Sequence, residues 1–410
     1  MRREVQQDAR GQGRAMSLAT AVTGAREWKF DLAGPDDLLA RACRDLKAGQ
    51  WWVAQESLDT CADFDTRARR SELLAAVAAR GDTDGYWLSE QPDNRHARLL
   101  AARAAVLRVK RASAEIRPAL IPKAEELCHR AAEADPADPT PWIALLILRA
   151  LGARADRTLT ITEGWTKFAA LRRYRSDQPW GETVANLMAG PGPAQPGIAQ
   201  QRHAQQILYG GAAIPETPIV GPWDVLFELW SRHPHSREGN LRFLDALRVE
   251  DAKLFAQLAS QIAPPDSLLQ MLPLSANLAE YRYRVERDGS VLAKESLAQR
   301  VWEDPQLRNV AVNLYEYWFL PRLTIRAPVE IGAYSLLAHA LVMTPGKDAV
   351  EERDLRGWRD RDDRQSRRAA DVMAAMRPYA STYPWSVTAP GGNGRQAFTK
   401  VAAELGVAPI

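Results

Sequence analysis

Two histidines and a nearby glutamate form the one local group in this chain with metal-binding chemistry. They are His233, His235 and Glu238, and divalent metals accept imidazole nitrogens and carboxylates as ligands. Pro234 turns the two histidine side chains apart, and neither a cysteine nor a further histidine lies nearby in sequence. We therefore expect a polar turn between helices, without a metal or other cofactor, and keep the three residues as the alternative metal site.

Tryptophan is the most unusual component of the sequence, because its thirteen residues outnumber both Phe (8) and Tyr (10). Those beside predicted turns are expected to fill the space between neighbouring helices, since buried aromatic rings dominate core packing. Trp51 and Trp52 differ, because adjacent residues on a helix point about 100° apart. We predict that one of these two rings anchors its helix and that the other stays accessible to a partner.

Basic residues in the same part of the chain complete a predicted partner site. Arg108, Lys110 and Arg111 would steer an acidic or extended partner toward the two tryptophans, because complementary charge speeds association. The predicted site therefore consists of Trp51, Trp52, Arg108, Lys110 and Arg111.

A second basic segment, residues 167–175, interleaves lysine and arginine with Phe168 and Tyr174. This combination can contact phosphates and stack on bases. Arginine in the second half of a helix is also favoured by the helix dipole alone, and the whole chain carries only +3, from 54 basic against 51 acidic residues. A nucleic-acid partner is therefore the less favoured expectation.

Sequence motifs of the common enzyme classes are absent. The chain contains no G-x-S-x-G, H-E-x-x-H, G-x-G-x-x-G or G-x-x-x-x-G-K-[ST] segment, so the hydrolase, zincin, dinucleotide and P-loop classes lose their usual support. A site assembled from residues far apart in sequence would escape this test, so catalytic activity stays open.

The elements that position these residues are expected to be helices. From Pro35 to about Met343, segments rich in Ala, Leu, Arg and Glu place apolar residues at spacings of three and four, whereas β-branched runs are short. The segments 71–79 and 97–109 contain more apolar residues than a surface helix needs for one buried stripe. This predicts that each helix packs against two neighbours. The fold class is predicted to be all-α.

Prolines punctuate this pattern at intervals of 30 to 55 residues. Proline lacks a backbone N–H and disfavours helix in the preceding residue, so it ends one helix and lets the next begin. Such intervals are typical of helical repeat arrays. The prolines in question are Pro92, Pro136, Pro179, Pro234, Pro264 and Pro305.

One unit of this array resembles a tetratricopeptide repeat. The segment Lys123 to Leu146 carries the small and large residues of that repeat at Ala124, Cys128, Ala131, Pro136, Trp142 and Leu145. The resemblance implies an α-solenoid of antiparallel helix pairs, with small residues where two helices approach closely. The chain as a whole also looks like Trp-rich helical-repeat proteins of actinobacteria.

Composition divides the chain into five segments. We expect a flexible N-terminal extension over 1–34, a helical-repeat lobe over 35–188, a Pro/Gly linker over 189–198, a second helical-repeat lobe over 199–345, and a charged helix with a C-terminal helical cap over 346–410.

Cysteine usage and hydropathy suggest a cytoplasmic location. Cys43, Cys61 and Cys128 are widely spaced and odd in number, which argues against a disulfide framework or a thiolate zinc site.

No apolar run approaches the roughly 18 residues that cross a bilayer. The basic N-terminus lacks the apolar core of a secretory signal, and either Met1 or Met16 could be the start.

Taken together, these features predict a non-catalytic scaffold that binds a protein or peptide, because stacked helix pairs form long concave surfaces. One alternative is an enzyme, or an enzyme accessory subunit, with a site built from dispersed residues. The other is a regulator that responds to nucleic acid or to a signalling peptide. A deep pocket with converging polar groups would favour the first alternative, and a continuous basic face the second.

Overall fold

The computed structural model describes residues 27–172, 221–288, 302, 304–324, 330–343, 363–381, 384–385 and 393–409. Within these ranges the chain is helical and forms no strand, only two isolated bridges, which confirms the all-α fold class. The first helices are α2 (Asp37–Lys47), α3 (Trp52–Asp59), α4 (Phe64–Ala78), α5 (Thr83–Glu90), α6 (Arg95–Arg111), α7 (Arg117–Ala134), α8 (Thr140–Asp156) and α9 (Ile161–Arg172).

The second part of the chain adds both α-helices and irregular turns. Its elements are α12 (Pro222–Trp230), α13 (Arg237–Leu244), α14 (Val249–Ile262), the 3₁₀ turn η1 (Leu268–Met271), α15 (Leu272–Asp288), α17 (Pro305–Asn313), the π-helix η2 (Leu314–Phe319), α18 (Leu320–Thr324), α19 (Ile331–Met343), α20 (Asp363–Ala375) and α22 (Gly394–Glu404).

Short polar side chains cap the first turn of many of these helices. The carboxylate of Asp63 accepts from the backbone N–H of Thr66 at 2.7 Å, and the Asn94 amide oxygen accepts from the N–H groups of His96 and Ala97. Such caps satisfy donors that have no partner inside the helix. The prolines therefore separate helices, as the sequence predicts, except Pro179, which lies outside the described residues.

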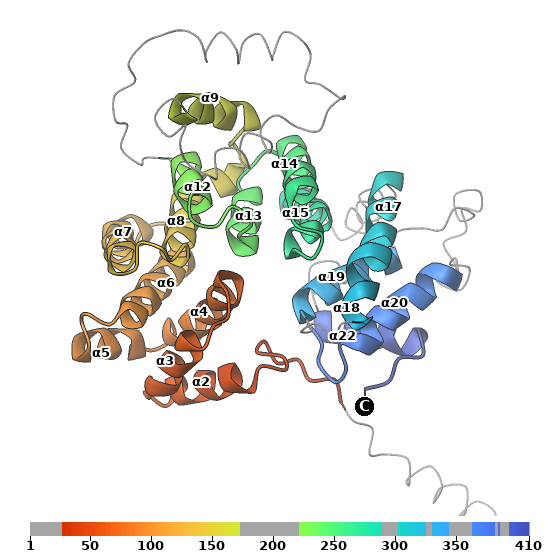
Figure 1. The fold of residues 1–410 in the computed structure, drawn as a ribbon, viewed down its shortest axis with the longest axis horizontal. Coiled ribbons are helices and arrows are strands. Elements are labelled where there is room, and N and C mark those ends of the chain that lie inside the picture. Colours follow the sequence, from red (N-terminus) through yellow and green to blue (C-terminus); the bar gives the residue numbers. More distant parts are fainter. Residues whose placement is uncertain are drawn as a thin grey trace, which may run out of the picture.

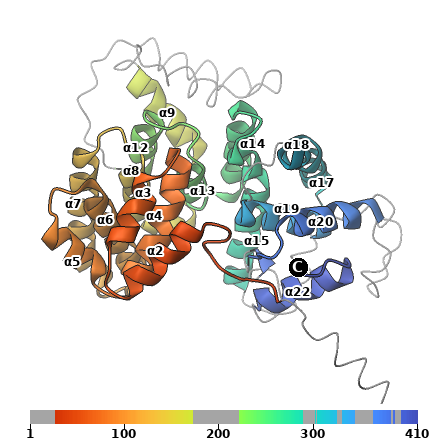
Figure 2. The same cartoon turned by 60° about the horizontal axis from the view of Figure 1, so that its bottom comes forward.

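The helices follow one another around an arc, with α2 to α8 at one end and α17 to α22 at the other (Figure 1). Helices α13 and α15 lie near the middle of this arc. The N-terminal segment runs from α2 back to the C-terminal elements, so the two ends of the described chain meet (Figures 1 and 2).

Helix α7 approaches α6 more extensively than any other pair of helices in the described chain, and it also packs against α8. Its buried residues are Ala124, Cys128 and Ala131, the small residues of the tetratricopeptide-like unit. Trp142 and Leu145 of that unit are buried on α8. This pair therefore has the burial pattern that the resemblance implies, although a regular solenoid of such pairs is not established.

Three hydrophobic cores lie along the chain. Two helices, α6 and α15, each contribute residues to two neighbouring cores. Helix α6 contributes Ala97 and Leu100 to an N-terminal core and Val106 to a central core. In the same way, α15 contributes Ala276 to the central core and Leu278 to a C-terminal core. The expectation that the helix over 97–109 packs on two neighbours is therefore confirmed.

These cores do not follow the predicted division into lobes at residues 189–198. The central core joins residues from Ala68 to Ala279, because α12 and α13 pack directly on α8. The linker itself lies outside the described residues. The predicted cap is also no separate layer, since α20 and α22 contribute Val372 and Phe398 to the C-terminal core.

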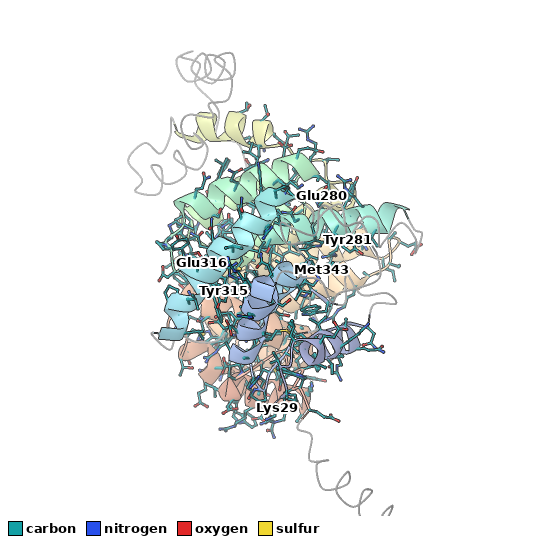
Figure 3. The ribbon with its side chains drawn as sticks, turned by 90° about the vertical axis from the view of Figure 1, so that its right-hand side faces the viewer. Lys29, Glu280, Tyr281, Tyr315, Glu316 and Met343 are labelled. Carbon is teal, nitrogen blue, oxygen red and sulfur yellow. The ribbon has the colours of Figure 1, made fainter. Side chains whose placement is uncertain are left out.

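The folded part of the chain begins before residue 35, where the sequence places the end of a flexible extension. Trp28 is only 8% exposed and makes an edge-to-face contact with Phe398, at 5.0 Å between ring centroids. The N–H of Lys29 donates to the Pro378 carbonyl, and the Lys29 carbonyl accepts from Ala380. Trp28, Lys29 and Phe30 therefore contact the C-terminal elements, and Figure 3 labels Lys29 among the side chains.

Among the tryptophans whose side chains the structure describes, eight are buried, in line with the expectation that they fill space between helices. The buried residues are Trp28, Trp87, Trp142, Trp223, Trp230, Trp302, Trp318 and Trp385. Several of them contact phenylalanine rings, and Trp230 stacks on Phe255 at 6.1 Å between ring centroids. None of the helices in the described chain combines the length and the apolar character that membrane crossing requires.

Candidate functional site

The paired tryptophans of the predicted partner site adopt two different environments. The Trp51 ring stacks on Trp87 at 5.2 Å, nearly parallel, and its indole N–H donates to Glu90 at 2.9 Å. Trp52 is 53% exposed and touches Trp51 only edge-on. One ring therefore anchors the α3–α5 contact and the other remains accessible, while binding of a partner here stays a prediction.

Substitution of the two rings should separate these environments. We expect Trp51→Ala to lower the free energy of unfolding by about 2–3 kcal/mol, because it removes a stacked pair and a hydrogen bond. Trp52→Ala should change it by less than about 0.5 kcal/mol, as surface substitutions usually do. Urea unfolding measures both, and equal losses for the two variants would contradict the assignment.

The three basic residues of that predicted site have different surroundings in the structure. Arg108 is held by Asp84 through two hydrogen bonds of 2.5 and 2.8 Å. Lys110 lines a pocket between α4, α6, α8 and α13, and Arg111 is exposed at the end of α6. These three side chains therefore have different surroundings, and a common partner site with the two tryptophans stays a prediction.

The histidine cluster is divided between two neighbourhoods. The imidazole of His233 lies 3.5 Å from the Asp65 carboxylate, whereas the Glu238 carboxylate accepts a 2.5 Å hydrogen bond from Arg103. Across the described ranges, His, Cys, Asp and Glu side chains nowhere gather in a group of three that could hold a metal ion. Glu238 is therefore part of a charge network, not of a site with His233 and His235.

The cysteines are free thiols with little reactivity. Burial raises the pKa of Cys128 to about 12 and that of Cys43 to about 11. Burial also raises the pKa of Cys61. Since the thiolate is the nucleophile and metal ligand, these raised pKa values disfavour both roles, and the buried Cys128 of α7 packs in the central core.

Two histidines should make stability depend on pH. Burial lowers the pKa of His96 and of His235, against the attraction of Asp59 and Asp65 respectively. The unfolded chain then binds protons near pH 6.5 more readily than the folded chain, so stability falls as pH drops below that value. We expect the loss between pH 7.5 and 5.5, measured by urea unfolding, to shrink in the variant His96→Gln with His235→Gln. An unchanged pH slope would contradict this.

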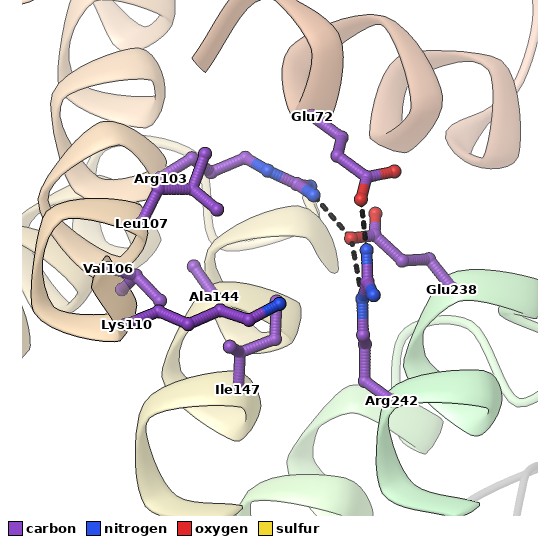
Figure 4. Close-up of a pocket in the computed structure, with 9 residues that line it drawn as sticks. All are labelled: Glu72, Arg103, Val106, Leu107, Lys110, Ala144, Ile147, Glu238 and Arg242. Carbon is purple, nitrogen blue, oxygen red and sulfur yellow. Dashed lines mark hydrogen bonds and ion pairs between the residues drawn. The ribbon is translucent and has the colours of Figure 1, made fainter. Parts of the chain in front are cut away.

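A buried charge cluster connects three helices (Figure 4). Arg103 extends from α6, Glu72 from α4, and Glu238 and Arg242 from α13. The Glu238 carboxylate accepts from Arg103, and Arg242 pairs with Glu72 and lies 3.6 Å from Glu238. The partners are 135 and 170 residues apart in sequence, so this network fixes the N-terminal helices against α13.

The environment shifts the pKa values of the two carboxyl groups in this cluster in opposite directions. Burial raises the pKa of Glu238, and the repulsion of Glu72 adds to this against the pull of Arg103. Burial also acts on the partly exposed Glu72, but Arg242 and Arg103 outweigh it and lower its pKa. Folding therefore disfavours the ionised form of Glu238, whereas it favours the ionised form of Glu72.

A groove of about 720 Å³ lies between α14, α15, α17 and η2, a size typical of ligand sites. Amide side chains dominate its polar lining, and among the described residues that line it only Lys253 and Asp304 are charged. Apolar surface from Leu307, Leu314 and Trp318 completes it. The amides are those of Gln257, Gln261, Gln270, Asn277, Gln306, Asn309 and Asn313.

Two of these amides are fixed by the backbone. Asn277 is 7% exposed and donates to the Pro273 carbonyl at 2.9 Å, which leaves its buried amide oxygen without a hydrogen-bond partner among the residues that the structure describes. Gln270 donates to the Ser260 carbonyl at the end of α14. The groove therefore presents an oriented, unsatisfied acceptor.

The groove wall on η2 is a π-helix that exposes an aromatic residue. Tyr317 is 74% exposed and lines the groove, while Trp318 beside it is buried beneath the guanidinium of Arg322 at 4.4 Å. Tyr315 and Glu316 of the same turn contact α20, through hydrogen bonds to Asp371 and from Arg368 (Figure 3). Single π-turns often occur at functional sites.

Comparisons with protein-family models, with curated proteins and with solved structures gave no match. The resemblance to tetratricopeptide and actinobacterial repeat proteins therefore stays an expectation.

Sequence reasoning missed the groove, although one signal for it exists. Gln306, Asn309 and Asn313 recur at spacings of three and four, which places three amides on one face of a helix. Gln257 and Gln261 do the same on α14. The charge cluster has no such signal, because its partners are distant in sequence.

Proposed function

We propose that this protein is an interaction module that binds an extended, largely uncharged peptide segment of a partner in the groove between α14, α15, α17 and η2. The amide lining is the observation that supports the proposal. A side-chain amide both donates and accepts, so rows of amides can pair with the N–H and C=O groups of an extended backbone. The unsatisfied oxygen of Asn277 supplies one buried acceptor for such a donor.

The remaining groove surface supports the same kind of ligand. Leu307 and Leu314 offer apolar contacts to side chains, and the exposed ring of Tyr317 can cover them. The scarcity of charge disfavours nucleic acid, whose phosphates require lysine and arginine. Catalysis is also less favoured, because neither cysteine nor histidine lines the groove among the described residues.

The test uses the full chain and a library of random dodecapeptides displayed on phage. We expect selected peptides to lose about tenfold in affinity when Asn309 and Asn313 are both changed to alanine, since each lost hydrogen bond costs about 0.5–1.5 kcal/mol. Both residues are exposed on α17, where alanine favours the helix, so the variant should fold. Fluorescence anisotropy measures the affinities.

Gln50→Ala is the matched control, because Gln50 is an exposed amide in the turn between α2 and α3, remote from the groove in the chain. It should bind the selected peptides as the parent does. The proposal fails if no peptide is enriched over an unrelated immobilised protein. It also fails if the α17 variant and the Gln50 variant bind equally well.

A further inference from the structure

The charge cluster borders a second pocket, which is independent of the peptide groove. It has a volume of about 120 Å³ and lies between α4, α6, α8 and α13 (Figure 4). Arg103 and Lys110 extend into it from α6, with Arg242 opposite. Its apolar wall consists of Val106, Leu107, Ala144 and Ile147.

Polar groups at this pocket are buried without full hydrogen bonding. The Arg103 side chain is 4% exposed, and one of its terminal nitrogens donates to Glu238. Its other terminal nitrogen, Nη1, has no hydrogen-bond partner within the described chain. An unsatisfied buried donor costs about 1–3 kcal/mol, more when it is charged, so a ligand that accepts from Nη1 would recover this energy.

The charges that line the pocket do not cancel. Three cations, Arg103, Lys110 and Arg242, face two carboxylates, Glu72 and Glu238. Just outside the lining, Arg237 attracts Glu72 and Asp245 attracts Arg242, and these two further charges offset each other. Among the described residues that line the pocket, cations therefore outnumber carboxylates by one, which favours an anionic ligand.

Size and wall chemistry restrict the ligand further. An apolar cavity of about 150 Å³ holds benzene, so this pocket has room for roughly four to six heavy atoms. Lys110 is exposed at the rim and Glu72 is 37% exposed, which leaves a route for entry. The wall around Ala144 and Ile147 would cover a short alkyl chain.

We propose that this pocket binds a carboxylate group carried on a short alkyl chain, with Arg103 Nη1 and the Lys110 ammonium as donors to the carboxylate and the wall at Ala144 and Ile147 against the chain. Two sources share this chemistry. One is a free small acid, and the other is an acidic side chain of a partner protein.

The experiment titrates the full chain with sodium butyrate by calorimetry, at constant ionic strength. Butyramide, which has the same shape without the charge, is the ligand control. A blocked peptide, N-acetyl-Gly-Glu-Gly-amide, represents the acidic side chain. Binding of butyrate assigns the site to a free acid, and binding of the peptide alone assigns it to a partner. Binding of neither overturns the proposal, as does equal binding of butyramide.

Neighbouring cations on α6 provide a matched pair of variants. Lys110→Met keeps the side-chain length and removes a pocket charge. It should weaken binding at least about tenfold for whichever ligand, butyrate or the glutamyl peptide, binds the parent. Arg111→Met removes the adjacent exposed charge, which does not line the pocket, and should bind as the parent does. Equal affinities for the two variants would overturn the assignment to this pocket, and neither substitution removes a buried side chain.

Discussion

Trp142→Ala is expected to lower the free energy of unfolding by about 3–5 kcal/mol, the usual loss for a large buried aromatic residue. The Trp142 ring is 8% exposed on α8, faces His129 of α7, and lies beneath the guanidinium of Arg232 at 4.7 Å. Its removal leaves a cavity where α7, α8 and the α12–α13 turn meet. Urea unfolding of the parent and the variant measures the loss.

Trp52→Ala is the control for this experiment, because it removes the same side chain from an exposed position. It should change the unfolding free energy by less than about 0.5 kcal/mol. If the unfolding curve of Trp142→Ala overlays that of the parent, Trp142 does not support the α7–α8 pair. The tetratricopeptide-like alignment from Ala124 to Leu145 would then lose its energetic basis.

Arg103→Met should destabilise the protein by a comparable amount, about 3–5 kcal/mol, because it takes from the buried Glu238 carboxylate the closer of its two arginines. The Glu238 side chain is 10% exposed, and Arg103 makes the shorter of its two arginine contacts. Glu238→Met should be at least as costly, since Glu238 faces both Arg103 and Arg242.

The double variant with both substitutions tests whether this loss comes from the pair. Methionine at both positions removes the buried charges together, so it should cost much less than the sum of the two single variants. Urea unfolding of the four proteins gives the coupling energy. Additive losses would show that Arg103 and Glu238 act independently. An Arg103→Met variant with the unfolding free energy of the parent would contradict the role of the cluster.

Features that depend on neighbours along the chain were predictable. Apolar spacing predicted the helices, and prolines such as Pro92 and Pro136 predicted where helices end, because both act through local backbone geometry. The same holds for the small buried face of α7 and for the different environments of Trp51 and Trp52. The amides on α17 carried a readable spacing that pointed to a common face.

Features that depend on which helix lies opposite were decided only by the tertiary structure. Helical periodicity tells that Arg103 and Glu238 lie on particular faces, but not that these faces meet across 135 residues. For the same reason the sequence does not show that Asp84 of α5 holds Arg108, or that Lys110 lines a pocket together with Arg103 and Arg242. Trp28 likewise belongs to the C-terminal core because the chain ends meet there. Local sequence determines the pattern on each helix surface, and only the packing of distant surfaces determines which charges, rings and amides share a site.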